Sequence, residues 1–163
     1  RESWFHLSKT KNTVEIFCIN AGHPEHEFRF SPNEESSLSI TIGQPEKYLF
    51  EPNPSIRKAG PWRSICEKFG VSMLHPNSHL FTGSMPLENF PGRVVIIHEV
   101  MPYKKETILA ALKGNPAQLV FYNFPVDAHE VTKSLGIKSG EPRYLFFTQT
   151  AACGPIVLFT THL

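Results

Sequence analysis

The sequence predicts an α+β / α/β protein in which a small β-rich unit precedes an α/β domain with a mixed sheet. Two observations lead to this prediction. Residues 1 to 46 place apolar and polar residues in alternation over short stretches, which is typical of half-buried strands. From residue 54 onward the apolar pattern gives the order helix, helix, strand, helix, strand, helix, strand, strand. That order favours helices layered on a sheet.

The β-rich unit is predicted from four short apolar stretches. Residues 4–7 and 14–19 read as two strands joined by a polar turn. A loop rich in Pro, Gly and His follows at 21–27, and residues 28–30 and 38–42 read as two more strands. A unit this small needs a partner to be stable. We therefore divide the chain into a unit of residues 1–46 and a larger domain of residues 47–163.

A helical pair opens the larger domain. Asn53 precedes Pro54, which fits an N-cap followed by proline at the first helical position, and Gly60-Pro61 breaks this helix after about one turn. A second helix then runs to Gly70, a glycine placed to end it. The spacing i, i+3, i+4, i+7 gives this second helix a buried face made of Trp62, Ile65, Cys66 and Phe69.

The rest of the domain alternates strands and helices, after an irregular stretch at 71–83. We expect the first two strands to be parallel through a right-handed crossover. Asp127 is the expected N-cap of the last helix, with Glu130 three residues later. The predicted elements are a strand at 94–100, a helix at 104–113 ended by Gly114, a strand at 118–124, a helix ended by Gly136, and a hairpin of 143–148 with 156–161.

Composition excludes several classes of protein. Sixteen Lys and Arg nearly balance fifteen Asp and Glu, so a net charge of +1 predicts that any anion site is local. Three cysteines without a CxxC motif favour a reducing, cytoplasmic location. No apolar run approaches the ~20 residues that span a bilayer, so we expect no membrane partner. The chain starts with Arg1 and enters a strand pattern almost at once. We expect it to be the C-terminal piece of a longer protein.

Sequence motifs for catalysis are missing. There is no GxGxxG, GxxxxGK[ST] or GxSxG motif. The pairs His23/His26 and His75/His79 have no third ligand nearby in the sequence, and a zinc site needs three or four. Cys66 lies on the buried face of its helix, where free cysteines are usually inert. We predict no catalytic residue, no metal and no cofactor in this fragment.

Local clusters of positive charge suggest where the chain could bind an anion. Arg57, Lys58 and Arg63 decorate the helical pair, and the alternative is an ordinary solvated helix surface. Lys104 and Lys105 come at the start of a helix, where cations oppose the macrodipole by ~0.3–1 kcal/mol each. An anion docked there would offset this cost.

Five motifs in the same order carry a family resemblance: "KYLFEPNPSIRKAG", "HLFTGS", "NFPGRVVIIHEVMPYKKE", "NFPVDAHEVTKSLGIKSG" and "RYLFFT". With these the chain resembles the C-terminal region of bacterial class I SAM-dependent methyltransferases of the Bacteroidetes-type group. The resemblance implies a ferredoxin-like unit at residues 1–46 and a THUMP-like domain at 47–163. Before the second "NFP" the family leads us to expect an arginine, and this chain has Tyr122.

The resemblance implies an RNA-binding accessory region. Its RNA would be structured, for example a tRNA, and its partner would be an N-terminal methyltransferase domain that uses S-adenosyl-L-methionine. Two alternatives stay open. The region could instead be a structural module that docks or dimerises the methyltransferase, or it could be an independent small-molecule enzyme. The candidate RNA-binding residues are Arg57, Lys58, Arg63, Lys104, Lys105 and Tyr122.

Overall fold

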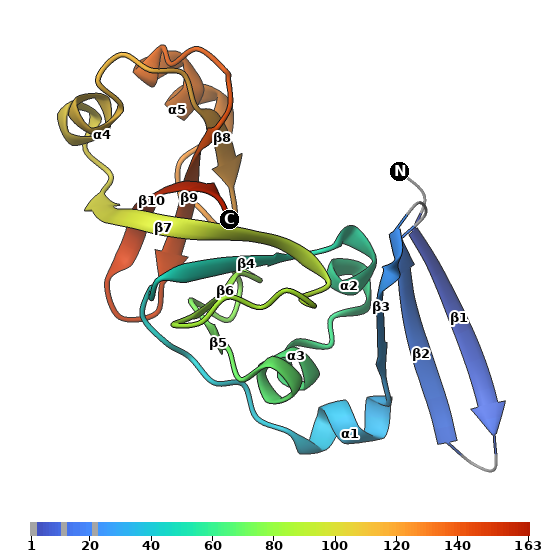
Figure 1. Cartoon of the computed structure of the whole chain (residues 1–163). Coiled ribbons are helices and arrows are strands. Elements are labelled where there is room, and N and C mark those ends of the chain that lie inside the picture. The colour runs from blue at the N-terminus through green and yellow to red at the C-terminus, as the bar shows by residue number, and fades with distance from the viewer. Residues whose placement is uncertain (1–2, 11–12, 21–22) are drawn as a thin grey trace.

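The computed structural model describes residues 3–10, 13–20 and 23–163, and their strands form two separate sheets (Figure 1). The smaller sheet is antiparallel, in the order β1 (Ser3–Thr10), β2 (Thr13–Asn20), β3 (His23–Phe30). This confirms the predicted hairpin. The third strand begins at His23, inside the stretch that was predicted to be a loop.

The predicted strand at 38–42 is wrong. A helix, α1 (Pro32–Ser37), occupies the preceding turn, and Ile42 makes an isolated bridge with Met73 rather than a strand. Proline at the first position and two glutamates in the first turn favour this helix. The alternating residues after it run extended, and Ile40 packs on the core without a continuous ladder.

The larger sheet has seven strands and combines the middle and end of the chain. Their order is β5-β6-β4-β7-β10-β9-β8, and β8 pairs parallel with β9 while the other named pairs are antiparallel. The sheet is therefore mixed, as predicted. The strands are β4 (Tyr48–Pro52), β5 (Ser72–Met73), β6 (Phe81–Gly83), β7 (Gly92–Pro102), β8 (Gln118–Phe121), β9 (Arg143–Thr150) and β10 (Gly154–His162).

Two details of this sheet differ from the expectation. The stretch at 71–83, predicted to be irregular, contributes the short strands β5 and β6. The strands β7 and β8 run in the same direction, as predicted, but β10 and β9 lie between them. The final hairpin fills this gap because its two strands pair with both neighbours.

Four helices accompany this sheet at the predicted places. They are α2 (Pro54–Ala59), α3 (Trp62–Phe69), α4 (Lys105–Leu112) and α5 (Ala128–Leu135). Asp127 caps α5 by accepting hydrogen bonds from the backbone N–H groups of His129 and Glu130. The helices α2, α3 and α5 each end at a glycine in the left-handed conformation, as the sequence suggested.

The core has three apolar clusters that follow this layout. Residues of α2 and α3 pack with β4 and β6, and residues of α4 and α5 pack with β9 and β10. A third cluster joins β4, β9 and β10 to the loop that contains Leu74 and Leu80. The helical pairs consequently lie toward the two ends of the seven-stranded sheet, with β7 running between them, and the small sheet lies beyond α2 (Figure 1).

The pairing of β4 with β7 holds the two ends together. Gly92 opens β7 opposite Pro52, and a Cβ built on Gly92 would lie 2.1 Å from the carbonyl oxygen of Glu51. Such a contact is impossible without moving backbone, so only glycine fits there. The close approach brings Glu51 and Arg93, the next residues of each strand, directly opposite each other.

Candidate functional site

A cleft lies where β4 leads into α2, beside the start of β7. Its volume is about 320 Å³, and its lining combines two arginines, one carboxylate and one amide. The lining residues are Glu51, Pro52, Asn53, Pro54, Arg57 and Arg93. Each position follows from local structure, because β4 presents Glu51, the last turn of α2 presents Arg57, and the β4–β7 pairing presents Arg93.

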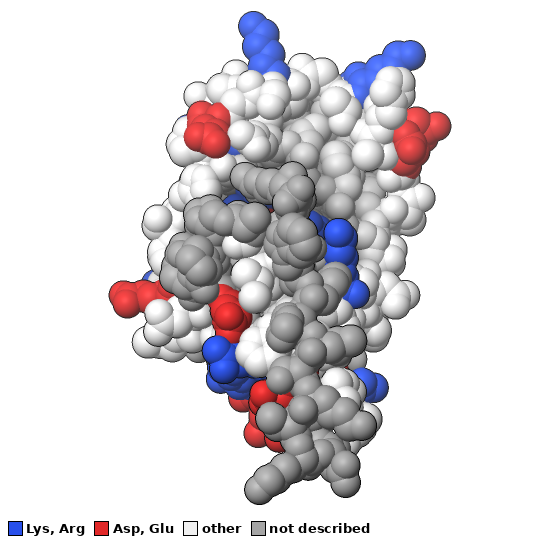
Figure 2. Space-filling view, turned by 90° about the vertical axis from the view of Figure 1, so that its right-hand side faces the viewer, with Lys and Arg blue, Asp and Glu red and all other residues white. Residues whose placement is uncertain are grey.

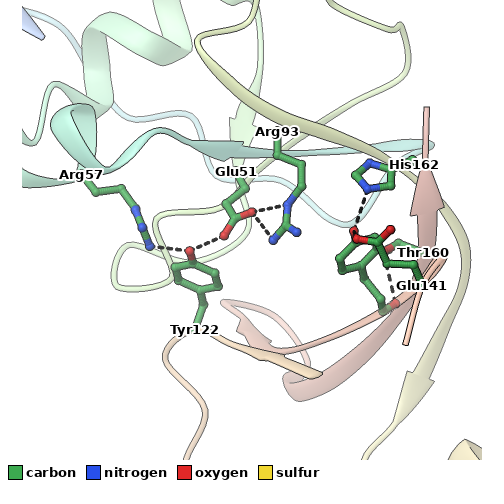
Figure 3. Close-up of polar contacts among 8 residues, drawn as sticks. Glu51, Arg57, Arg93, Tyr122, Glu141, Thr160 and His162 are labelled. Carbon is green, nitrogen blue, oxygen red and sulfur yellow. Dashed lines mark hydrogen bonds and ion pairs between the residues drawn. The ribbon is translucent and has the colours of Figure 1, made fainter. Parts of the chain in front are cut away.

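A chain of hydrogen bonds crosses this site (Figure 3). Arg57 Nη1 donates to the hydroxyl of Tyr122, and that hydroxyl donates to Glu51 Oε1. The other carboxylate oxygen, Oε2, accepts from Arg93 Nε at 2.6 Å and lies 2.5 Å from Arg93 Nη2. Each end of the network is therefore a guanidinium group, and a single carboxylate lies between them.

Tyr122 reaches this site from the far edge of the sheet. It follows β8, which is separated from β4 by β7, β10 and β9. Four strand spacings amount to roughly 19 Å in a flat sheet. The contact between Tyr122 and Glu51 therefore requires a strongly curved sheet and a loop that turns back across its face.

The network has consequences for charge. Burial, together with the neighbouring Glu51 carboxylate, raises the pKa of the Tyr122 hydroxyl, which stays protonated as a hydrogen-bond donor. Two guanidinium groups and one carboxylate leave one unit of positive charge among the lining residues. Arg57 Nε and Asn53 Nδ2 are buried and have no hydrogen-bond partner among the described residues.

A second group of polar residues adjoins Arg93. The Arg93 guanidinium lies over the ring of Tyr144, 4.7 Å from the ring centre, and over the ring of Phe146 at 5.3 Å. The Tyr144 hydroxyl is 2.6 Å from His162 Nε2 and 3.3 Å from a carboxylate oxygen of Glu141. Burial raises the pKa of Tyr144, and Glu141 adds to this effect. These contacts hold the Arg93 guanidinium on the sheet face.

An aromatic stack stands near Arg57. Trp62, the first residue of α3, stacks on His79 with ring centres 4.3 Å apart and planes tilted by 13°. His79 has a positive φ of 55°, which is uncommon for histidine. Burial lowers the pKa of His79, and the positive charge of Arg57 lowers it further. The stacked imidazole is thus neutral near pH 7.

The structure brings together two of the six candidate residues, Arg57 and Tyr122. Lys58 is exposed beside them on α2. Arg63 instead lies 3.8 Å from Glu35 of α1, and Lys105 donates through Nζ to the backbone carbonyl of Ser134 in α5.

The remaining candidate, Lys104, is the exposed N-cap of α4, toward the opposite end of the seven-stranded sheet from α2 (Figure 1). The six residues therefore do not form one surface. Figure 2 shows Lys and Arg side chains at separate places on the face it presents, with Asp and Glu between them.

Three residues of the cleft escaped the sequence analysis. Glu51 and Asn53 belong to the "FEPNPSIR" stretch, where Asn53 was expected only to cap a helix, and Arg93 was not among the six candidates. A useful signal was present, because Glu51 directly follows the apolar run 48–50 and Arg93 directly precedes the apolar run 94–97. Their pairing depends on the strand register, which the pattern of residues does not reveal.

The candidates for metal and thiol chemistry have structural roles. Among the residues that the structure describes, no group of three His, Cys, Asp or Glu side chains could hold a metal ion. His75 Nδ1 accepts from the backbone N–H of Asn77 and lies 3.1 Å from Asn123 Nδ2. Cys66 is buried, and its burial raises the thiol pKa. The side chains of His23 and His26 lie outside the described residues.

Comparison with known proteins defines the domains. Residues 48–91 match the family model of a ferredoxin-like domain, and residues 92–162 match that of a THUMP domain-like family. The chain carries a ferredoxin-like domain followed by a THUMP-like domain. The resemblance read from the five motifs is thereby confirmed. The ferredoxin-like match begins at residue 48, so it lies after the segment 1–46 to which the sequence analysis gave that name.

The two domains share the seven-stranded sheet. The ferredoxin-like domain contributes β4, β5 and β6, the THUMP-like domain contributes the other four strands, and the domains meet at the β4–β7 pair. The network of Glu51, Arg57, Arg93 and Tyr122 therefore spans their junction. In the described part of the chain no helix is long and apolar enough to cross a membrane.

A solved structure resembles both domains. It is the crystal structure of a predicted methyltransferase from Porphyromonas gingivalis W83, with 29% sequence identity and a TM-score of 0.76. The similarity covers 83% of this chain and 34% of that one, so the chain spans about a third of the length of the protein it matches. No curated protein sequence matches significantly.

Proposed function

We propose that this chain is the RNA-binding accessory region of a SAM-dependent methyltransferase. It would hold a structured RNA, such as a tRNA, for a catalytic domain outside these residues, and S-adenosyl-L-methionine would bind to that domain. The observation that carries the proposal is the succession of ferredoxin-like and THUMP-like domains, which resembles a predicted methyltransferase at 29% identity. The free thiols of Cys18, Cys66 and Cys153 fit a cytoplasmic protein.

Within this proposal the junction cleft is the RNA-facing site. Arg57 and Arg93 give it positive charge, and Lys58 lies exposed next to it. Lys104 is a second, separate contact, because its side chain is exposed at the start of α4. Arg63 and Lys105 contribute less, since each already has an acceptor within the chain. Phosphate contacts of this kind position an RNA without reading its sequence.

A second function is favoured by the distribution of charge. A net charge of +1 and cations separated by acidic residues suit a module that docks or dimerises the methyltransferase without touching RNA. The two functions differ in their response to salt, because RNA binding releases counterions and docking through apolar surface does not.

The test measures the binding of bulk tRNA to the chain by fluorescence anisotropy, at about 50 mM and about 200 mM salt. We expect binding at low salt that weakens steeply at high salt. Lys58→Gln should reduce the salt slope by about 1, as expected for one lost phosphate contact. Lys133→Gln, which removes an exposed cation of α5, is the charge-matched control and should leave the slope unchanged. If tRNA does not bind at low salt, the docking function is the better account.

A further inference from the structure

Two donors in the junction cleft lack acceptors. Arg57 Nε and Asn53 Nδ2 are buried, line the same cleft, and have no hydrogen-bond partner in the described part of the chain. Buried N–H groups are nearly always paired, because leaving one unpaired is costly. Two such groups on neighbouring residues of one cleft therefore indicate an acceptor that this chain does not supply.

One edge of the Arg57 guanidinium has no acceptor among the described residues. Its Nη1 donates to Tyr122, while Nε has no acceptor among the described residues. The edge that carries Nε is one of the forks with which arginine binds phosphate through two parallel hydrogen bonds. Tyr122 is itself held by Glu51, and the centre of its ring lies 5.4 Å from Arg57 Cζ.

Charge in the cleft favours an anionic acceptor. Glu51 is the lining carboxylate, and both of its oxygens already accept hydrogen bonds, one from Tyr122 and one from Arg93. Arg93 balances that carboxylate, so the charge of Arg57 remains uncompensated within the cleft. A bound anion would supply both the missing charge and the missing acceptors.

The size of the cleft limits the ligand. About 320 Å³ is at the lower end of the ~300–1,000 Å³ typical of small-molecule sites. This space suits one phosphate with the adjoining part of a nucleotide, and it does not suit a duplex.

We propose that the junction cleft binds one phosphate group of a single RNA strand, with Arg57 and the Asn53 amide as its donors. The proposal rests on the proposed RNA-binding function and locates one phosphate within it. Both donor atoms are covered in the structure, so the phosphate engages them through a rotamer change of these two side chains. Arg93 stays paired with Glu51 and neutralises that carboxylate.

The experiment is a titration of the full ¹⁵N-labelled chain with inorganic phosphate and then with a short single-stranded RNA, observed by NMR. We expect saturable shifts of the Asn53 side-chain amide and Arg57 Nε–H signals with both ligands. Arg57→Lys keeps the charge but removes the fork, and should weaken phosphate binding roughly tenfold. Asn53→Asp keeps a good N-cap residue but places a negative charge in the cleft, where it repels phosphate. This substitution should abolish phosphate binding.

Controls separate the outcomes. Lys133→Gln should bind phosphate like the parent chain, and thermal unfolding shows whether each variant is folded. If the RNA binds but the Asn53 and Arg57 signals do not move, and Asn53→Asp binds RNA normally, the phosphate site is overturned and the RNA-binding function stands. If phosphate moves these signals and neither the short RNA nor bulk tRNA binds, the cleft is a site for free phosphate, and the RNA-binding function fails.

Discussion

The N-termini of α3 and α4 both lack a side-chain cap from their own N-cap residue, but they differ in the charge that lies beside them. Both helices have eight residues, and neither N-cap residue, Pro61 or Lys104, offers a side-chain hydrogen bond. At α3 a carboxylate from another helix fills this role. Glu35 of α1 accepts from the backbone N–H groups of Arg63 at 2.9 Å and Ser64 at 2.7 Å, and from the Ser64 hydroxyl at 2.5 Å.

At α4 two cations stand where an anion is preferred. Lys104 is exposed, but Lys105 donates to the carbonyl of Ser134 in the last turn of α5. A cation at the C-terminal end of a helix is favourable. Lys105 therefore stabilises the C-terminal end of α5, although its charge is unfavourable at the N-terminal end of α4. The comparison teaches that an unfavourable charge in a sequence can have a structural partner in another element. Of these two lysines, Lys104 has no such partner among the described residues.

The largest expected effect concerns the borrowed cap of α3. Glu35→Ala removes two backbone caps and an ion pair from a carboxylate that is 12% exposed, and should lower the free energy of unfolding by about 2 kcal/mol. Urea denaturation measures this loss. Glu34→Ala, on an exposed neighbour in the same helix, is the control and should change stability by less than about 0.5 kcal/mol. Equal effects of both substitutions would mean that Glu35 does not cap α3.

The second prediction reverses the charge penalty at α4. Lys104 has the extended backbone of an N-cap, with φ −133° and ψ 125°, so serine at this position can cap the helix. Lys104→Ser should raise the free energy of unfolding by about 1 kcal/mol and weaken tRNA binding. Lys105→Ser is the comparison, and it should not stabilise because it removes the contact with Ser134. If Lys104→Ser stabilises the chain and leaves tRNA binding unchanged, Lys104 is no RNA contact.

Much of the fold follows from local pattern. The buried stripe of α3 places Ile65 and Cys66 in the core, Asp127 caps α5, and the hairpin of β9 and β10 has the predicted bounds within a few residues. The failure at 38–42 is also local. Ser31-Pro32 with two following glutamates indicates a helix start, but the alternation of the apolar residues after it suggested a strand.

The site was less predictable because it depends on contacts distant in sequence. Arg57 was identified from charge alone, whereas its partner Tyr122 lies 65 residues away and reaches it across a curved sheet. Tyr122, which stands where the family leads us to expect an arginine, accepts a hydrogen bond from Arg57 and donates one to Glu51. Register and curvature decide which charged residues meet, and neither is encoded in short-range periodicity.

The smallest expected effect is a pH dependence of the free energy of unfolding. It arises from His79, which stacks on Trp62, the first residue of α3. His79 stacks on Trp62, and burial with the nearby Arg57 lowers its pKa, so the folded chain binds this proton less readily than the unfolded chain. The corresponding stability is present above the unfolded pKa of about 6.5 and is lost as the pH falls through it. His79→Asn, which tolerates the positive φ, should flatten the fall in unfolding free energy between about pH 7 and pH 5. Urea denaturation at several pH values measures it, with His129→Asn on the exposed surface of α5 as the control. The site at α4 has no such buried imidazole among the described residues, so a pH dependence that survives His79→Asn would have to arise elsewhere than at the Trp62 stack.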